Sequence, residues 1–160
     1  MLQITKYQPR YHTQIIQMIL KIQTEEFSFP VTIDDQPDLK DIPAYYLKGN
    51  GNFWVATEDD KVVGTIGLID INNSRCGLRK MFVAKEYRGK EKNIAKSLLD
   101  GLLKWGRDKE LKEIYLGTVD AFVAAQKFYQ KSGFVEIDKN LLPKEFSALA
   151  IDNRFYVYRF

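Results

Sequence analysis

The stretch Met81–Leu99, MFVAKEYRGKEKNIAKSLL, constrains the fold of this chain more than any other segment. It predicts a strand, then a basic loop that contains glycine, then an amphipathic helix over Asn93–Arg107. The N-terminus of a helix presents unpaired N–H groups and about half a positive charge. Gly89 allows the backbone of the loop to approach a ligand closely. The segment therefore predicts a site for an anion such as a pyrophosphate.

Two common phosphate-binding loops do not account for this segment, because the patterns G-x-x-x-x-G-K-S/T and G-x-G-x-x-G are both missing from the sequence. Between Arg79 and Lys96, seven lysines and arginines stand against two glutamates, whereas the whole chain has a net charge of +3. The remainder is slightly acidic, which argues against a nucleic-acid surface spread over several elements. An ordinary charged surface turn is the alternative.

Length and composition predict one soluble domain over residues 1–160. Hydrophobic residues make up 45% and charged residues 28% of the 160 residues. No apolar run is long enough to span a membrane, and the N-terminus does not resemble a signal peptide. The single cysteine, Cys76, cannot form an internal disulfide, so we expect a reduced, cytoplasmic setting.

Hydrophobic periodicity predicts an α/β (α+β) fold with the element order βααβββαβαββ and a mixed, mostly antiparallel sheet. The expected elements are strand Leu2–Tyr7, helix Pro9–Phe27, a short helix Asp38–Leu47 interrupted by Pro43, strands Phe53–Thr57, Val62–Ile69 and Cys76–Val83, helix Asn93–Arg107, strand Glu113–Thr118, helix Val123–Lys131, and strands Phe134–Ile137 and Arg154–Phe160.

Two motifs in the right order resemble those of the GNAT (N-acetyltransferase) superfamily. Arg88-Gly89-Lys90 followed by Asn93-Ile94-Ala95 resembles the family's Q/R-x-x-G-x-G/A loop. The segment Ala125–Phe134, AQKFYQKSGF, resembles its A-x-x-L/F-Y-x-x-x-G-F helix. The loop is a residue or two longer than usual, and Asn93 stands where glycine is usual. Asparagine tolerates a positive φ better than other non-glycine residues, so the turn can survive.

The resemblance implies a twisted sheet of about seven strands with helices on both faces. It also implies an acyl-CoA-dependent N-acyltransferase that moves acetyl from acetyl-CoA directly to a primary amine in a ternary complex. The acceptor would be a small molecule or a peptide, without nucleic acid or membrane partners, and a homodimer is possible. The alternative is a non-catalytic CoA-binding or sensor module on the same fold.

The family places coenzyme A between two parallel strands that splay apart, here within Leu78–Val83 and Glu113–Thr118. The residues that match its cofactor-binding positions are Met81, Phe82, Val83, Arg88, Gly89, Lys90, Asn93, Ile94, Ala95, Lys96 and Phe128. Many members also carry an asparagine where this chain has Phe122.

Tyr129 matches the family's general acid. A phenol, with a pKa of about 10, is close enough to a thiol, at about 8.5, to protonate a leaving thiolate. Direct transfer needs no enzyme nucleophile, so we expect Cys76 to be a packed strand residue and His12 a surface residue. The sequence shows no His/Cys metal cluster.

The sequence does not identify the base that accepts the proton of the amine. The candidates, by exclusion only, are Glu25, Glu26, Asp34, Asp35 and Asp70. Strand alternation predicts that Arg79 and Lys80 point to opposite faces. One of them could then favour an acidic acceptor, and plain surface charge is the alternative.

Overall fold

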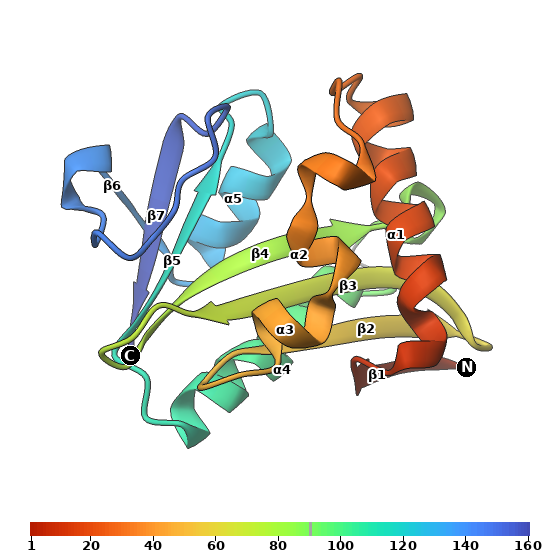
Figure 1. Cartoon of the computed structure of the whole chain (residues 1–160), viewed down its shortest axis with the longest axis horizontal. Coiled ribbons are helices and arrows are strands. Elements are labelled where there is room, and N and C mark those ends of the chain that lie inside the picture. Colours follow the sequence, from red (N-terminus) through yellow and green to blue (C-terminus); the bar gives the residue numbers. More distant parts are fainter. Residues whose placement is uncertain (90) are drawn as a thin grey trace.

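The computed structural model describes residues 1–89 and 91–160, and within them it forms one seven-stranded sheet in the order β1-β2-β3-β4-β5-β7-β6 (Figure 1). The strands are β1 (Leu2–Lys6), β2 (Asn52–Glu58), β3 (Lys61–Asp70), β4 (Arg75–Val83), β5 (Glu113–Thr118), β6 (Val135–Ile137) and β7 (Arg154–Arg159). In this part of the chain, β4 and β5 make the one parallel pair. The mixed, mostly antiparallel sheet is thus confirmed.

Helices cover both faces of the sheet. The α-helices are α1 (His12–Lys21), α2 (Pro37–Lys40), α3 (Ile42–Tyr46), α4 (Ile94–Asp108) and α5 (Val123–Lys131). Figure 1 shows α1, α2 and α3 on one side of the sheet, with α4 and α5 on the other. Leu98 and Leu102 of α4 are buried in one core cluster, and Ile15 and Ile19 of α1 in a second one. The periodicity of these apolar side chains predicted both faces.

Local chemistry explains where the helices depart from the predicted ranges. Helix α1 continues into a π-helical turn over Ile22–Glu26, which ends at Phe27. The helix predicted over Asp38–Leu47 is split into α2 and α3. Proline lacks an N–H and disfavours a helical residue before it, so Pro43 fits only in the first turn of a new helix. Asp41 caps that helix by accepting a hydrogen bond from the N–H of Ala44 at 3.2 Å.

Strand β4 contains a β-bulge that overturns one expectation from the sequence. Between the pairs Thr65↔Phe82 and Gly67↔Arg79, two residues of β4 oppose one residue of β3. Lys80 occupies the bulge with φ at 53°, and the hydroxyl of Thr65 donates to its carbonyl at 2.7 Å.

The bulge shifts the alternation of side chains by one residue. The core on the α4 side receives Cys76 and Leu78 before the bulge but Met81 and Val83 after it. Arg79 and Lys80 therefore both point to the opposite side. The prediction that they lie on opposite faces was wrong, because alternation holds only in a strand without an extra residue.

None of the helices in the described part of the chain has the length and apolar character that crossing a bilayer requires.

Two glycine substitutions should change stability in opposite directions. A Cβ on Gly67 of β3 would lie 2.6 Å from the ring of fully buried Tyr46, whereas a Cβ on Gly101 of α4 would meet no atom within 4 Å. We expect Gly67→Ala to lower the free energy of unfolding by about 1–3 kcal/mol through overpacking. Gly101→Ala should raise it by about 0.5–1 kcal/mol through helix propensity. Urea denaturation measures both, and an unchanged midpoint for Gly67→Ala would contradict the packing of α3 on β3.

Candidate functional site

The parallel pairing of β4 and β5 is interrupted after three residues. Arg75, Cys76 and Gly77 pair with Glu113, Ile114 and Tyr115 respectively, and the described residues beyond them do not pair across this gap. Figure 1 shows the two strands diverging from this point. The splay expected within 78–83 and 113–118 is present in the structure. Backbone groups along the two open edges are left without a strand partner, which is costly if no other group satisfies them.

Hydrogen bonds at the end of β4 identify which backbone groups face the opening. The N–H of Ala84 donates to the carbonyl of Val63 on β3 at 2.8 Å. Neighbouring residues of a strand direct their backbone groups to opposite sides, so Val83 faces away from β3. Its carbonyl indeed accepts from Nε of Arg88 at 2.8 Å. The N–H groups of Met81 and Val83 thus point toward the gap.

A cleft of about 750 Å³ runs along this opening between the end of α1, strand β4, the start of α4 and helix α5. Its lining includes Met81, Phe82, Val83, Arg88, Gly89, Asn93, Ile94, Ala95, Lys96, Phe128 and Tyr129. These are the residues selected from the sequence, apart from Lys90, which lies outside the described residues. The structure thus brings the lining residues between Met81 and Lys96 into one hollow with Phe128 and Tyr129, which lie 32 to 48 residues further along the chain.

The floor of the cleft at its basic end is the N-terminus of α4. Asn93 precedes the helix with φ at 54° and ψ at 31°, the left-handed conformation that the sequence anticipated for it. Its side chain makes no capping hydrogen bond in the structure as described, so it leaves the first N–H groups of α4 uncapped. Gly89 has φ at 120°, a conformation that side chains disfavour. Ile94 is buried against β3, which anchors the helix start beside β4.

Arg88 is held in place by two groups. Besides its bond to Val83, its guanidinium forms a two-pronged ion pair with Glu26 at the end of α1, with Nη2 at 2.8 Å from Oε2. The hydrogen bond from Arg88 lowers the pKa of Glu26, which is therefore ionised at neutral pH. The pair positions the guanidinium at the cleft and offsets part of its charge.

Tyr129 reaches the cleft from α5. Its side chain is only 7% exposed, and its ring packs against those of Phe128, Phe134 and Tyr156. Its hydroxyl donates a weak hydrogen bond to Sδ of Met81 at 3.6 Å, so it lies beside the part of β4 that lines the cleft. Burial raises the pKa of Tyr129 above that of a free phenol. The phenol therefore stays protonated at neutral pH, and burial makes it a weaker acid than a free phenol.

Comparison with known proteins agrees with this geometry. Residues 16–134 match the model of the acetyltransferase (GNAT) family. The chain belongs to the GNAT family. A crystal structure of a GNAT-family acetyltransferase from Staphylococcus aureus has 42% sequence identity and a TM-score of 0.94, covering 99% of both chains. Both the recognised superfamily and the fold class are confirmed.

Two further comparisons mark the extent of the similarity. N-acetyltransferase 8B of Homo sapiens is 36% identical over 110 residues, which are 65% of this chain and 48% of that protein. The chain thus spans about half the length of this curated relative. A structure of the PaiA N-acetyltransferase from Thermoplasma acidophilum in complex with coenzyme A has 16% identity and a TM-score of 0.74, covering 100% of this chain and 99% of that one. At that identity, it supports the fold alone.

Three phenylalanines pack together at one side of the cleft in this GNAT domain, a contact that the sequence analysis did not predict. Phe122, at the start of α5, lies 4.6 Å from Phe27 and 5.9 Å from Phe29 between ring centroids. Phe27 and Phe122 both line the cleft. Phe122 was noted only as a departure from asparagine. Its contact with the end of α1 depends on tertiary structure, which no local pattern encodes.

Cys76 and His12, two potentially reactive side chains, lie outside the cleft. Cys76 is buried, and burial raises the pKa of its thiol to about 12. His12 shares a hydrogen bond with the hydroxyl of Tyr7 through Nδ1 at 3.1 Å. Among the described residues, no three His, Cys, Asp or Glu side chains gather as a potential metal site.

Of the five carboxylates considered as bases, Glu26 lines the cleft, where Arg88 engages it. Asp34 pairs with Lys40, Asp35 accepts from the N–H of Thr32, and Asp70 accepts from the N–H groups of Asn50 and Asn72. Glu25 lines a separate, smaller hollow beside α1. Two carboxylates that the sequence analysis did not select, Asp38 and Asp152, lie closer to the bulge of β4.

The left-handed turn at Asn93 predicts how substitutions there affect stability. We expect Asn93→Val to lower the free energy of unfolding by about 1–2 kcal/mol, because a side chain branched at Cβ is strained at positive φ. Asn93→Gly should stay within about 0.5 kcal/mol of the unsubstituted protein, because glycine adopts this conformation freely. Thermal and urea unfolding of the two variants provide the comparison. Equal stability of both would show that residue 93 is not held at positive φ.

Proposed function

We propose that this chain is an acyl-CoA-dependent N-acyltransferase that transfers acetyl from acetyl-CoA directly to a primary amine within a ternary complex. One observation carries the proposal: the open backbone edge of β4, the N-terminus of α4 and the hydroxyl of Tyr129 border the same cleft. The first provides hydrogen bonds for an extended ligand, the second a site for an anion, and the third a proton.

Coenzyme A has the chemical parts that this cleft would hold. Its pantetheine arm is an extended chain with two amides, which can pair with the N–H groups of Met81 and Val83 like an additional strand. Its pyrophosphate suits the N–H groups at Ile94–Lys96, with Arg88, Gly89 and Lys90 beside them. Phe82 and Phe128 would flank the arm as apolar walls. The Thermoplasma acidophilum N-acetyltransferase, which shares this fold, was solved in complex with coenzyme A.

The transfer chemistry follows from the positions of the same groups. The lone pair of the deprotonated amine attacks the thioester carbonyl, and the N–H groups of β4 would stabilise the oxyanion that forms. The C–S bond then breaks as the tetrahedral intermediate collapses to an amide. Tyr129 would donate its proton to the sulfur of the leaving thiolate, and it regains a proton from solvent or from the proton that the amine releases. This route uses no enzyme nucleophile, in keeping with the buried thiol of Cys76.

A non-catalytic CoA-binding module on the same fold is the second candidate. The specific observation that favours the enzyme is the hydroxyl of Tyr129, because a protein that only binds the cofactor needs no proton donor at its sulfur. The two candidates share the cofactor site and differ in turnover. An acceptor screen that detects the free thiol of coenzyme A separates them.

Tyr129→Phe tests the acid directly. We expect kcat to fall about 10²–10⁴-fold, because general acid catalysis contributes that much, while the Kd for acetyl-CoA changes less than about twofold. Tyr158→Phe is a matched control, since Tyr158 packs on Phe134 outside the cleft. Stopped assays of thiol release and calorimetric binding give the two quantities. Unchanged kcat in Tyr129→Phe would remove this residue from its role.

Substitutions of Arg88 and Glu26 should affect the affinity for acetyl-CoA differently. Arg88→Gln removes a cation from the cleft, so we expect acetyl-CoA to bind about tenfold more weakly, the value of one charge-assisted contact. Glu26→Gln releases the guanidinium from its carboxylate partner, and the affinity should stay equal or rise. Titration calorimetry at two salt concentrations measures both. Equal weakening in the two variants would assign the pair a structural role instead.

A further inference from the structure

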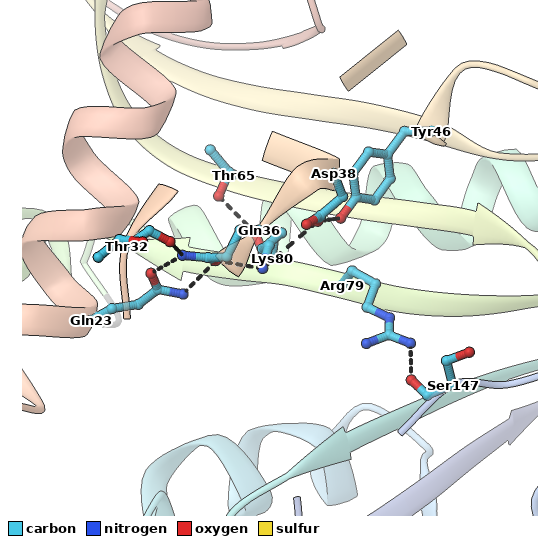
Figure 2. Close-up of polar contacts among 9 residues, drawn as sticks. All are labelled: Gln23, Thr32, Gln36, Asp38, Tyr46, Thr65, Arg79, Lys80 and Ser147. Atoms are coloured by element: carbon cyan, nitrogen blue, oxygen red, sulfur yellow. Dashed lines mark hydrogen bonds and ion pairs between the residues drawn. The ribbon is translucent and has the colours of Figure 1, made fainter. Parts of the chain in front are cut away.

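The bulge in β4 places two cations on the side of the sheet away from α4. Figure 2 shows Arg79 directed toward Ser147 and Lys80 directed toward Gln36 and Asp38. Both residues directly precede Met81, where the lining of the cofactor cleft begins. Phe82, the next residue of β4 on the same side as Lys80, lines that cleft as well. The two cations thus stand where a second substrate would meet the splayed strands from the face opposite α4.

The guanidinium of Arg79 is oriented but not neutralised. It lies over the ring of Phe146 at 5.1 Å, and Nη2 donates to the backbone carbonyl of Ser147. Nε is buried without a hydrogen-bond partner in the described structure, and no described carboxylate forms an ion pair with this side chain. A buried donor without a partner is costly, so a ligand that supplies an acceptor to this guanidinium would be favoured. Stacking on Phe146 and the bond to Ser147 fix the plane in which the remaining N–H groups point.

Lys80 is fixed by a buried amide pair. Its ammonium, on a side chain only 11% exposed, donates to Oε1 of Gln36 at 2.7 Å. Gln36 and Gln23 exchange hydrogen bonds of 3.0 and 2.8 Å, which hold the acceptor oxygen in place. Asp38 lies 3.7 Å from the ammonium, but its Oδ2 already accepts from the hydroxyl of Tyr46 at 2.6 Å. Burial lowers the pKa of Lys80 despite this neighbour, so the carboxylate compensates the ammonium only in part.

The other charged groups near Arg79 and Lys80 do not neutralise the rest of their positive charge. Asp152 faces Arg79 and Lys80, yet it forms no ion pair with either in the described structure and accepts a hydrogen bond from the N–H of Leu149 at 3.1 Å. Burial raises the pKa of Asp152, which weakens it as a counter-charge. Arg75, earlier on β4, is already paired with Glu145 at 3.0 Å. Within the described structure, Arg79 and Lys80 together therefore have one direct carboxylate contact, that of Lys80 with Asp38.

We propose that Arg79 and Lys80 form a carboxylate subsite, so that the acceptor of this enzyme is an amine that also carries a carboxylate, such as an amino acid. The inference rests on the proposed acetyl transfer and adds the class of acceptor. Arg79 supplies a planar, two-pronged donor for the carboxylate, and Lys80 supplies a second charge beside it. The amine of the same molecule then extends toward Met81 and the thioester.

The test compares matched acceptors on the full chain with saturating acetyl-CoA. The panel holds L-amino acids and ω-amino acids, each beside its carboxamide, and thiol release gives kcat and KM. We expect the carboxylates to be acetylated with kcat/KM at least tenfold above their carboxamides. Arg79→Gln should raise KM for the carboxylates about tenfold or more and leave KM for the carboxamides within twofold. Arg75→Gln, which removes a charge that Glu145 already neutralises, is the control and should change neither.

The outcomes separate this inference from the proposed function. If carboxamides or simple amines turn over as well as the carboxylates, the subsite is disproved while acetyl transfer stands. If Arg79→Gln raises KM equally for the carboxylates and the carboxamides, Arg79 has a structural role and does not recognise the carboxylate. If acetyl-CoA binds but no amine turns over, calorimetry of the panel on the CoA-loaded protein decides: carboxylate binding lost in Arg79→Gln upholds the subsite, and equal or missing binding refutes it. If acetyl-CoA does not bind, the proposed function fails, and the subsite fails with it.

Discussion

The interrupted pairing of β4 and β5 is the constraint on which the rest of the molecule depends. Three parallel pairs join the strands at one end, and beyond Gly77 and Tyr115 the backbone groups that face each other across the gap have no strand partner in the described structure. Cores cover both faces of the sheet, with α4 and α5 on one side and α1, α2 and α3 on the other. The opening is thus built into the fold, and it leaves main-chain donors available to a ligand.

The bulge at Lys80 is the second constraint, and it acts on the same strand. One extra residue in β4 turns Met81 and Val83 toward the α4 side and leaves Arg79 and Lys80 on the other. The hydroxyl of Thr65 holds the bulged carbonyl, and the Gln23–Gln36 pair holds the lysine. A single local irregularity therefore assigns the proposed cofactor edge and the proposed carboxylate subsite to opposite sides of one strand. Under the proposed function, two substrates would approach the same opening from different directions.

Much of this architecture was predictable from the sequence, because it depends on local chemistry. Periodicity predicted the helices around Leu98 and Ile15, the motif at Arg88–Ala95 predicted a turn followed by the start of a helix, and the tolerance of asparagine for positive φ predicted the left-handed conformation of Asn93. Other features depend on tertiary contacts. The bulge requires the register between β3 and β4, the Arg88–Glu26 pair joins residues 62 apart, and the contact of Phe122 with Phe27 links α5 to α1. No short sequence pattern around Lys80 predicts the bulge, and none around Phe122 predicts the contact with Phe27.

In the proposed complex, the open edge of β4 receives the pantetheine arm of acetyl-CoA. Amide hydrogen exchange, followed by NMR for each residue with and without acetyl-CoA, measures this pairing. We expect the N–H groups of Met81 and Val83 to exchange more slowly in the complex, because they gain hydrogen-bond partners. The N–H of Ala84, already bonded to Val63, should show little change. Tight binding of acetyl-CoA with unchanged exchange at Met81 and Val83 would show that the arm does not pair with this edge.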